Sequence, residues 1–237
     1  MNYLILFLFI VLISYGIVGR HFRIIEKLRM ILSNINNPQS KNKWIILLTM
    51  CVNPNQTDKS HTQDEINYRK NLYTDVINKW LNKTSLPIYV VESSGYTFDE
   101  IKNDRLTVFS FNGEKHGNSS LAEKYSILYA LDKLKSVDCN YVLKVTGKYF
   151  LENIEYVLDQ LPDDYDIYTQ QHRQPGSQNT EYYGIKKELF YEFANTCCEN
   201  IMEGHLYKYM IGKKVIDIPF QFSNNVARGD GSIISNL

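Results

Sequence analysis

The chain has no excess of charge of either sign. Its 237 residues include 26 Lys and Arg and 26 Asp and Glu, so the formal net charge is zero. Because nucleic-acid binding draws on a surplus of basic residues, we do not expect a nucleic-acid partner. The sequence also contains no G-x-G-x-x-G fingerprint and no Walker phosphate loop. These absences disfavour a dinucleotide-dependent dehydrogenase and a P-loop NTPase.

Cysteine is sparse as well. The four cysteines show no C-x-x-C spacing and no paired histidines; they are Cys51, Cys139, Cys197 and Cys198. A zinc site is therefore not expected, and a disulfide scaffold is not implied. What the chain has in quantity is length enough for one sizeable domain with its own core.

The first long uncharged stretch, residues 3–19, is dominated by Leu, Ile, Phe and Val. At about 1.5 Å per residue it is just long enough to span a thin bilayer. No Lys or Arg precedes it and no A-x-A-like site follows, which favours a retained anchor over a cleaved signal peptide. We expect residues 1–19 to be a single-pass membrane anchor, residues 20–43 a basic stem and residues 44–237 the catalytic domain.

The sequence leaves open which side of the membrane this domain occupies. The basic cluster Arg20, Arg23, Lys27 and Arg29 follows the span, and the positive-inside rule then places the domain in the cytosol. Three N-x-S/T matches, at Asn55, Asn82 and Asn118, would suit the lumenal side, but such matches arise by chance in an Asn-rich chain.

Beyond residue 43, apolar runs of strand length alternate with amphipathic segments. The predicted strands are Trp44–Thr49, Pro87–Glu92, Leu106–Ser110, Tyr141–Val145, Asp166–Thr169 and Lys214–Ile218. The predicted helices are Ile66–Leu81, Ser120–Leu134, Glu152–Leu161 and about Lys186–Ile201. Continuous apolar runs are typical of strands covered on both faces. The alternation predicts an α/β fold with a mainly parallel sheet flanked by helices.

Polar residues follow three of these strands, where each strand ends. They are Thr49 and Asn53 after the first, Glu92 and Ser94 after the second, and Thr146 and Gly147 after the fourth. In a parallel sheet these ends meet at one edge, where they would form a ligand crevice. The alternative is a set of ordinary βα turns, which also favour Asn, Ser and Gly.

The segment Lys144-Val-Thr-Gly-Lys148 carries the most specific chemistry. Lys144 and Thr146 point to the same face of the strand, and Gly147 permits a close approach of the backbone. A lysine within an apolar strand is costly unless its ammonium reaches water or an anion. Lys144 and Lys148 could therefore neutralise a diphosphate without a metal. The alternative is a surface turn in which Lys144 reaches solvent.

Two further residues have a ligand-binding and a structural interpretation. Arg69 could clamp a phosphate in bidentate fashion, or pair with Glu65 along a helix surface. Glu123 lies in the first turn of a helix that could receive an anion, but Ser120-x-x-Glu123 is also a capping box.

Two carboxylates near the C-terminal part of the domain are candidates for a general base. Glu181 precedes Tyr182-Tyr-Gly184, and Glu203 begins the segment Glu203-Gly-His205. Either could activate an acceptor hydroxyl, and either could equally be a solvated surface acid.

Taken in order, four groups of residues resemble GT-A-like glycosyltransferases of the kind found in surface-polysaccharide gene clusters and large DNA viruses. The groups are Leu47-Leu-Thr-Met-Cys-Val-Asn-Pro54, Arg69-x-x-x-Tyr73, Val90-Val-Glu-Ser-Ser-Gly95 and Leu143-Lys-Val-Thr-Gly-Lys-Tyr149. The likeness covers roughly Trp44 to Glu203. It implies a Rossmann-like fold, a nucleotide-diphosphate sugar bound across the strand ends, and transfer of the sugar to a carbohydrate acceptor or another hydroxyl.

The resemblance also implies positions for the donor. The residues facing the nucleoside would be Thr49, Asn53, Glu92 and Ser94, with Arg69 near them. The residues near the diphosphate or the sugar would be Lys144, Thr146, Gly147 and Lys148. We expect Lys148 to stabilise the leaving diphosphate and Glu181 or Glu203 to act as the base.

The chain departs from the family pattern at the end of the fourth strand. GT-A enzymes usually carry a metal-binding Asp-x-Asp there, and this sequence has Thr146, Gly147 and Lys148. A divalent metal is therefore not indicated. Two alternatives stay open: a non-catalytic relative that binds a glycan or a partner, and a sugar nucleotidyltransferase. The second would need a glycine-rich, lysine-bearing loop after the first strand, which Thr49 to Pro54 do not provide.

Overall fold

A computed structural model describes residues 42–54, 61–114, 118–162, 164–170, 175–196, 201–218, 226–227 and 233–234. The main sheet contains β1 (Trp44–Met50), β2 (Ile88–Glu92), β3 (Leu106–Ser110), β4 (Tyr141–Thr146), β5 (Ile167–Thr169), β6 (Tyr182–Lys186) and β7 (Val215–Asp217). A short antiparallel pair joins β8 (Val226–Ala227) to β9 (Ile233–Ile234). The predicted anchor at residues 3–19 lies outside the described residues, and no helix within them could cross a membrane.

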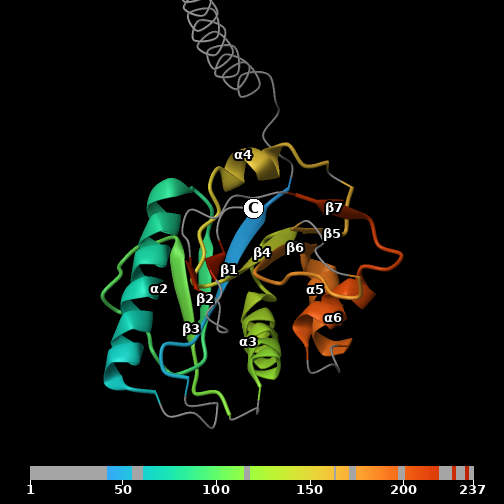
Figure 1. Cartoon of the computed structure of the whole chain (residues 1–237). Helices are drawn as coiled ribbons and strands as arrows, with labels where there is room; N and C mark the ends of the chain where they lie inside the picture. Colours follow the sequence, from blue (N-terminus) through green and yellow to red (C-terminus); the bar gives the residue numbers. More distant parts are fainter. Residues whose placement is uncertain are drawn as a thin grey trace, which may run out of the picture. The chain divides into compact units, whose positions relative to one another are not determined.

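The strand order is β3-β2-β1-β4-β6-β5-β7, which Figure 1 shows running from β3, near α2, to β7. Every neighbouring pair is parallel except those that involve β6, which runs antiparallel to both β4 and β5. The predicted α/β fold with a mainly parallel, Rossmann-like sheet is therefore confirmed. The antiparallel strand β6 is the segment Tyr182–Lys186, for which the sequence predicted no strand.

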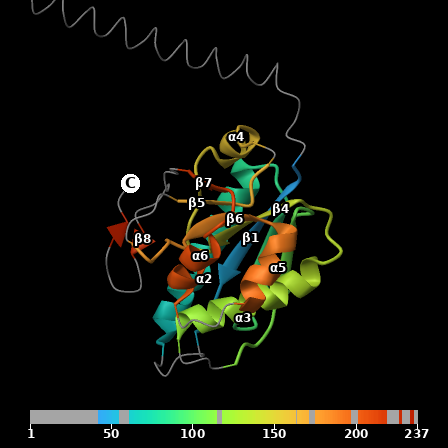
Figure 2. The ribbon, with the colours of Figure 1, turned by 90° about the vertical axis from the view of Figure 1, so that its right-hand side faces the viewer.

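Helices cover both faces of this sheet. The first core, on one face, is formed with α2 (Gln63–Lys83) and α4 (Ile154–Asp159). The second core is formed with α3 (Ser119–Leu134), α5 (Lys187–Thr196) and α6 (Met202–Tyr209). Figure 2 shows α5 beside α3. Alternate residues of β1 enter the two cores, which explains why its sequence is apolar throughout.

Several helix boundaries differ from the prediction, and two of the differences, at the start of α3 and the end of α5, concern residues near the site. Helix α3 is capped by Asn118, whose side chain accepts a hydrogen bond from Leu121 N at 2.8 Å, so the predicted capping box of Ser120 and Glu123 is wrong. Asn is a strong N-cap residue, and its use leaves Glu123 available for other contacts. The predicted helix to Ile201 is also wrong, because Ile201 has extended backbone angles and precedes α6.

The sheet contains one reversal that matters for ligand binding. From β1 the chain adds β2 and β3 on one side, then returns through α3 to place β4 on the other side of β1. Thr49 of β1 and Thr146 of β4 are register partners next to this point. In open α/β sheets, ligands bind outside the carboxyl ends of strands at such a topological switch point.

Candidate functional site

We call the edge of the sheet that carries the ends of β1, β2 and β4 and the start of β6 the strand-end rim. Its tightest point is Gly147, directly after β4. The Gly147 N–H donates to Thr49 O at 2.9 Å, and a Cβ there would lie 2.2 Å from Met50 Cγ. The close approach predicted for Gly147 is confirmed, and its partner is the end of β1. A side chain at this position would force the two strand ends apart.

Lys144 lies on the face of β4 that α3 covers, and its side chain is 0% exposed. The ammonium forms an ion pair with Glu123 and donates to Thr180 O at 2.8 Å and to Thr146 Oγ1 at 3.1 Å. Both predictions for Lys144 are therefore wrong: its ammonium does not reach solvent, and it is bonded to protein groups and does not face a diphosphate site. Its charge is already balanced by a carboxylate of the protein, which is what makes its burial tolerable.

Glu123 makes contacts at the rim that neither of its two sequence interpretations predicted. Its Oε1 accepts from Thr49 Oγ1 at 3.1 Å and pairs with Lys144, while the side chain keeps 21% of its surface exposed. Glu123 thus reaches from α3 to the ends of both β1 and β4. The signal in the sequence was the lysine in an apolar strand, which requires an anionic partner but does not say which acid provides it.

Both predicted base candidates lie at the same rim. Glu181 directly precedes β6, and because β6 is antiparallel this start meets the end of β4: Thr146 N donates to Glu181 O at 2.7 Å. The Glu181 carboxylate accepts from Gln170 at 2.6 Å. Glu203, in the first turn of α6, accepts from Thr180 Oγ1 at 3.2 Å. Both glutamates are half-buried.

The surroundings of Glu203 include a buried polar atom without a partner. Gln178 is 0% exposed; its N–H donates to Glu203 O at 3.1 Å and its Nε2 donates to Gln170 O at 2.6 Å. Within the part of the chain that the structure describes, Gln178 Oε1 has no hydrogen-bond partner, and the same is true of Asn53 Oδ1 at the end of β1. Buried polar atoms are rarely left unsatisfied, so both mark places where a polar ligand or water can bind.

Glu92 and Ser94 hold two loops of the rim together. The buried Glu92 carboxylate accepts from the backbone N–H groups of Val52, Ser94 and Tyr96 at 2.8, 2.9 and 2.7 Å, and from Ser94 Oγ at 2.5 Å. Ser94 Oγ in turn accepts from Asn53 N at 3.0 Å. These contacts occupy the groups that were expected to face a nucleoside. In this structure Glu92 and Ser94 position Asn53.

Arg69 reaches the end of β1 from α2. Its Nη1 donates to Cys51 O at 3.4 Å, beside Tyr73, whose pKa is raised by burial. The predicted Glu65–Arg69 pair is replaced by a capping box, in which Glu65 and Thr62 exchange hydrogen bonds. Arg69 is therefore near the rim, as a phosphate-binding residue would be.

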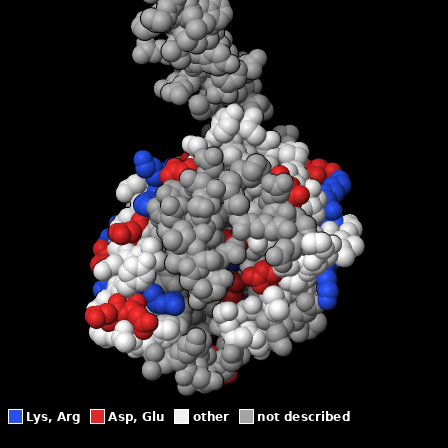
Figure 3. All heavy atoms as spheres, viewed as in Figure 1, with Lys and Arg blue, Asp and Glu red and all other residues white. Residues whose placement is uncertain are grey.

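Lys148 follows Gly147 and is half-buried, with its ammonium 5.2 Å from the centre of the Tyr149 ring. Unlike Lys144, it lies beyond the end of the strand rather than within it. Figure 3 shows acidic side chains gathered near the middle of the face seen in Figure 1.

The end of β4 does not fit a divalent cation. Thr146, Gly147 and Lys148 supply a hydroxyl, backbone groups and an ammonium, whereas Mg²⁺ and similar hard cations are bound through carboxylates. The described residues contain no group of three or more His, Cys, Asp or Glu arranged for a metal.

An Asp-x-Asp sequence does occur elsewhere in the chain, at Asp164-Tyr-Asp166. It lies at the amino end of β5, where Asp164 pairs with Lys214 and Asp166 pairs with Lys186 at 3.1 Å. A hydrogen bond from Lys214 N, together with Lys186, lowers the pKa of Asp166. Both carboxylates are at the edge of the sheet opposite the rim and are used in structural contacts.

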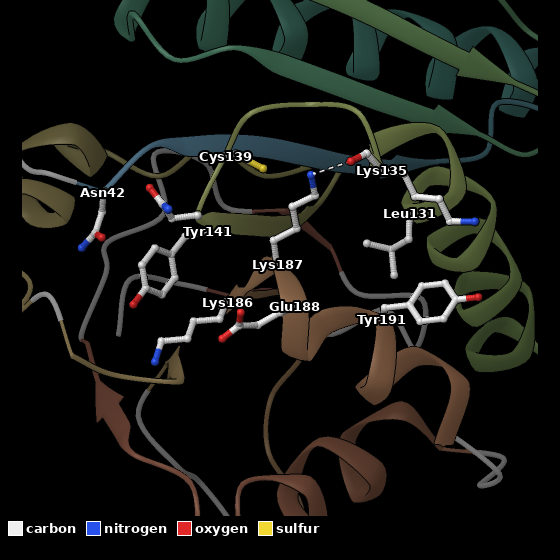
Figure 4. A pocket seen from close by; sticks show the side chains of 10 residues that line it. Asn42, Leu131, Lys135, Cys139, Tyr141, Lys186, Lys187, Glu188 and Tyr191 are labelled. Atoms are coloured by element: carbon white, nitrogen blue, oxygen red, sulfur yellow. Dashed lines mark hydrogen bonds between the residues drawn. The ribbon is translucent and has the colours of Figure 1, made fainter.

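A cavity of about 570 Å³ lies at that opposite edge, between α3, α5 and the amino end of β4. The lysines that line it are already bonded: Lys187 donates to Lys135 O at 3.1 Å and to Val137 O, as Figure 4 shows for the first contact. Lys186 is paired with Asp166. We therefore place the candidate functional site at the rim, where Gln178 Oε1 and Asn53 Oδ1 have no partner among the described residues, and not at this cavity.

No protein-family model and no curated protein matches the chain. Among solved structures, it is similar to a cytidylyltransferase of Leptospira borgpetersenii (12% identity, 75% of this chain, 76% of that chain, TM-score 0.46). It is similar to a glycosyltransferase involved in glycosylation of the major capsid of PBCV-1 (13% identity, 73% of this chain, 81% of that chain, TM-score 0.47). It is also similar to the glycosyltransferase GlyE of Streptococcus pneumoniae, with 10% identity over 74% of this chain and 46% of that chain and a TM-score of 0.46. With TM-scores below 0.5, these likenesses carry no part of the functional argument, which rests on the strand order and the rim.

Proposed function

We propose that the chain is a glycosyltransferase that moves a sugar from a nucleotide-diphosphate sugar to a hydroxyl of a carbohydrate or another acceptor. The observation that carries this proposal is the β1/β4 switch point. The rim beside it contains a half-buried cation, Lys148, and two half-buried carboxylates, Glu181 and Glu203. Switch points of this kind hold nucleotides, and convergent polar groups beside them are the usual mark of a ligand site.

The rim suggests how the donor lies. The nucleoside would bind at the ends of β1 and β2, where Asn53 Oδ1 is an unused acceptor and Arg69 is within reach. The diphosphate would lie over Gly147, next to Lys148. The sugar would then point toward Glu123, Glu181 and Glu203, on the β4–β6 side of the rim.

In the reaction, the acceptor oxygen bonds to the anomeric carbon and the bond from that carbon to the diphosphate breaks. The diphosphate leaves with the bonding electron pair, and Lys148 stabilises its developing charge. The proton of the acceptor hydroxyl passes to a carboxylate, Glu203 or Glu181. Glu203 is the better placed, since one hydrogen bond fixes Oε1 and Oε2 has no partner among the described residues. No divalent metal is needed in this scheme.

We also propose that residues 3–19 anchor the enzyme in a membrane as a single span. The support is the uncharged apolar run followed by a basic segment. Alkaline carbonate extraction of membranes from expressing cells provides the test. The full chain should stay in the membrane fraction, and release into the supernatant would contradict the proposal.

The proposed activity is tested with the full chain in detergent and a panel of UDP, GDP, CMP and dTDP sugars. We expect the donors of one nucleotide to raise the melting temperature, and release of nucleotide to proceed in EDTA. Glu203→Gln should lower turnover while keeping donor binding.

Three outcomes would overturn parts of this proposal. Absence of any donor binding would remove the proposed function. Donor binding with no transfer to any acceptor would favour a non-catalytic binding protein, and strict dependence on Mn²⁺ would contradict the metal-independent scheme. Formation of a nucleotide sugar from a nucleoside triphosphate and a sugar 1-phosphate would favour a nucleotidyltransferase.

A further inference from the structure

We propose that Glu123, fixed by the buried Lys144, receives the donor's sugar ring and makes the enzyme selective for sugars that carry no carboxylate. This inference rests on the proposed function and assigns to the same site a class of sugar. It concerns a residue of α3 and the charge that surrounds it on the β4–β6 side of the rim.

The first argument is that Glu123 is held in one place. One oxygen, Oε1, is bound by Thr49 Oγ1 and by Lys144 Nζ, and that ammonium is itself fixed by Thr180 O and Thr146 Oγ1. The lysine has no exposed surface and so cannot turn away to solvent. A carboxylate held by a buried, fully coordinated cation is pre-organised for binding. Lys144 is thus a positioning residue.

The second argument is that Glu123 keeps the means to bind. Its other oxygen, Oε2, has no partner among the described residues, and the side chain is 21% exposed at the switch point. An ionised carboxylate accepts hydrogen bonds and donates none, so it suits the hydroxyl groups of a sugar. The buried Gln178 Oε1, beside Glu203, is an independent acceptor without a partner in the same network.

The third argument is the local charge. Two more carboxylates belong to the same side of the rim as Glu123. Thr180, whose carbonyl accepts from Lys144, donates through Oγ1 to Glu203, and the Glu181 carboxylate accepts from Gln170, whose carbonyl accepts from Gln178. Lys148, the other cation of this region, is assigned to the diphosphate. Among the described residues, this side of the rim therefore carries the carboxylates of Glu123, Glu181 and Glu203, and the ammonium of Lys144 is already paired with Glu123. A further carboxylate on the sugar would be repelled, since like charges brought together at a binding site disfavour the complex.

Pairs of donors that differ only at C6 test this inference directly. UDP-glucose and UDP-glucuronate share the nucleotide and the ring, and so do UDP-galactose and UDP-galacturonate; GDP-mannose and GDP-mannuronate cover the second nucleotide. Dissociation constants are measured by calorimetry on the full chain. We expect the neutral member to bind at least about tenfold more tightly than the uronate, and the gap to narrow in 0.5 M salt, which screens charge.

Glu123→Gln is the decisive variant, because it removes the charge and keeps the shape. It should reduce the gap to less than about threefold by improving uronate binding. Glu203→Gln should shift the same ratio, and Glu188→Gln, an exposed acid next to the cavity at the opposite edge, should leave it unchanged. Because the readout is a ratio of two ligands, a variant that is merely less stable does not imitate the effect.

Equal binding of the two members of a pair by the wild-type chain would overturn the inference, as would an unchanged ratio in Glu123→Gln. Either result leaves the glycosyltransferase proposal intact. Absence of binding by every donor of the UDP, GDP, CMP and dTDP panel, the pairs included, would instead remove the proposed function, and the inference with it.

Discussion

The two edges of the same sheet are built in opposite ways. The amino edge contains a cavity of about 570 Å³, yet the lysines that line it are already bonded to carbonyl groups and to Asp166. The strand-end rim brings together Lys148, two half-buried glutamates and two buried acceptors, Asn53 Oδ1 and Gln178 Oε1, that have no partner among the described residues. Buried acceptors without a partner among the described residues therefore mark the candidate site in this fold better than the volume of a cavity does.

The same contrast appears in two ion pairs. Lys144 and Glu123 at the rim have exposed fractions of 0% and 21%, whereas Lys135 and Asp132 near the cavity have 63% and 60%. A buried charge that loses its partner stays desolvated, while an exposed one is taken up by water. The two pairs therefore provide a matched test of what each edge contributes.

The largest expected effect follows from Lys144→Met. Removing the ammonium leaves Glu123 without its counter-charge, and breaking a buried pair in this way costs about 3–5 kcal/mol. The control Lys135→Met should change the unfolding free energy by less than about 1 kcal/mol. Urea denaturation of the two variants measures both. Similar losses in the two variants would show that the pairs do not differ as described.

Lys148→Ala should act on turnover instead of stability. Loss of an electrostatic group aimed at the leaving diphosphate is expected to reduce turnover by about 10² to 10³-fold. Donor binding should weaken less than turnover does. Lys186→Ala, at the other edge, is the control and should stay within about twofold of the wild type. Wild-type turnover in Lys148→Ala would exclude the assigned role.

Glu92→Gln tests whether the rim depends on its supports. The carboxylate accepts four hydrogen bonds, two at each oxygen. In the amide only one oxygen remains as an acceptor, so the hydrogen bonds at the other position are lost. We expect a loss of about 1.5–3 kcal/mol in stability, the usual value for a hydrogen bond to a charged group, and a weaker affinity for the donor. Unchanged donor affinity, measured by calorimetry, would separate Glu92 from the site.

The smallest effect concerns acid stability at the amino edge. The hydrogen bond from Lys214 N and the nearby Lys186 lower the pKa of Asp166, so its folded pKa lies below its unfolded pKa. The stabilisation is then present above about pH 4 and disappears as the pH falls through the folded pKa. Asp166→Asn should remove about 1 kcal/mol at pH 7 and less at pH 2 to 3. Donor affinity should not change, because this edge is not the site.

The sequence predicted the elements better than their contacts. The strand Leu106–Ser110 agrees residue for residue, and the other predicted strands agree to within one or two residues, because buried apolar runs have few other structures available to them. The direction of β6 was not predictable, since Tyr182–Lys186 contains no signal for orientation. That direction is what brings Glu181 to the end of β4.

The sequence predicted that several residues of the rim would lie together, but it predicted only some of their contacts. Thr49, Gly147 and the two glutamates meet at the predicted edge, while Lys144 and Glu92 support it from within. The pairing of Lys144 with Glu123 joins a strand to a helix through the packing of the second core. Local sequence does not predict such a contact. The sequence offered both Asn118 and Ser120 as helix caps, and the choice of Ser120 assigned Glu123 to a capping box.

The central claim is that the donor binds at the strand-end rim. Hydrogen–deuterium exchange of the full chain, with and without the donor that the nucleotide-sugar panel identifies, tests it most directly. The account predicts slower exchange in peptides covering residues 50–54, 93–96 and 146–149, and unchanged exchange in peptides covering 135–141 and 186–191. Protection of the second set without the first would place the donor in the cavity and contradict the claim.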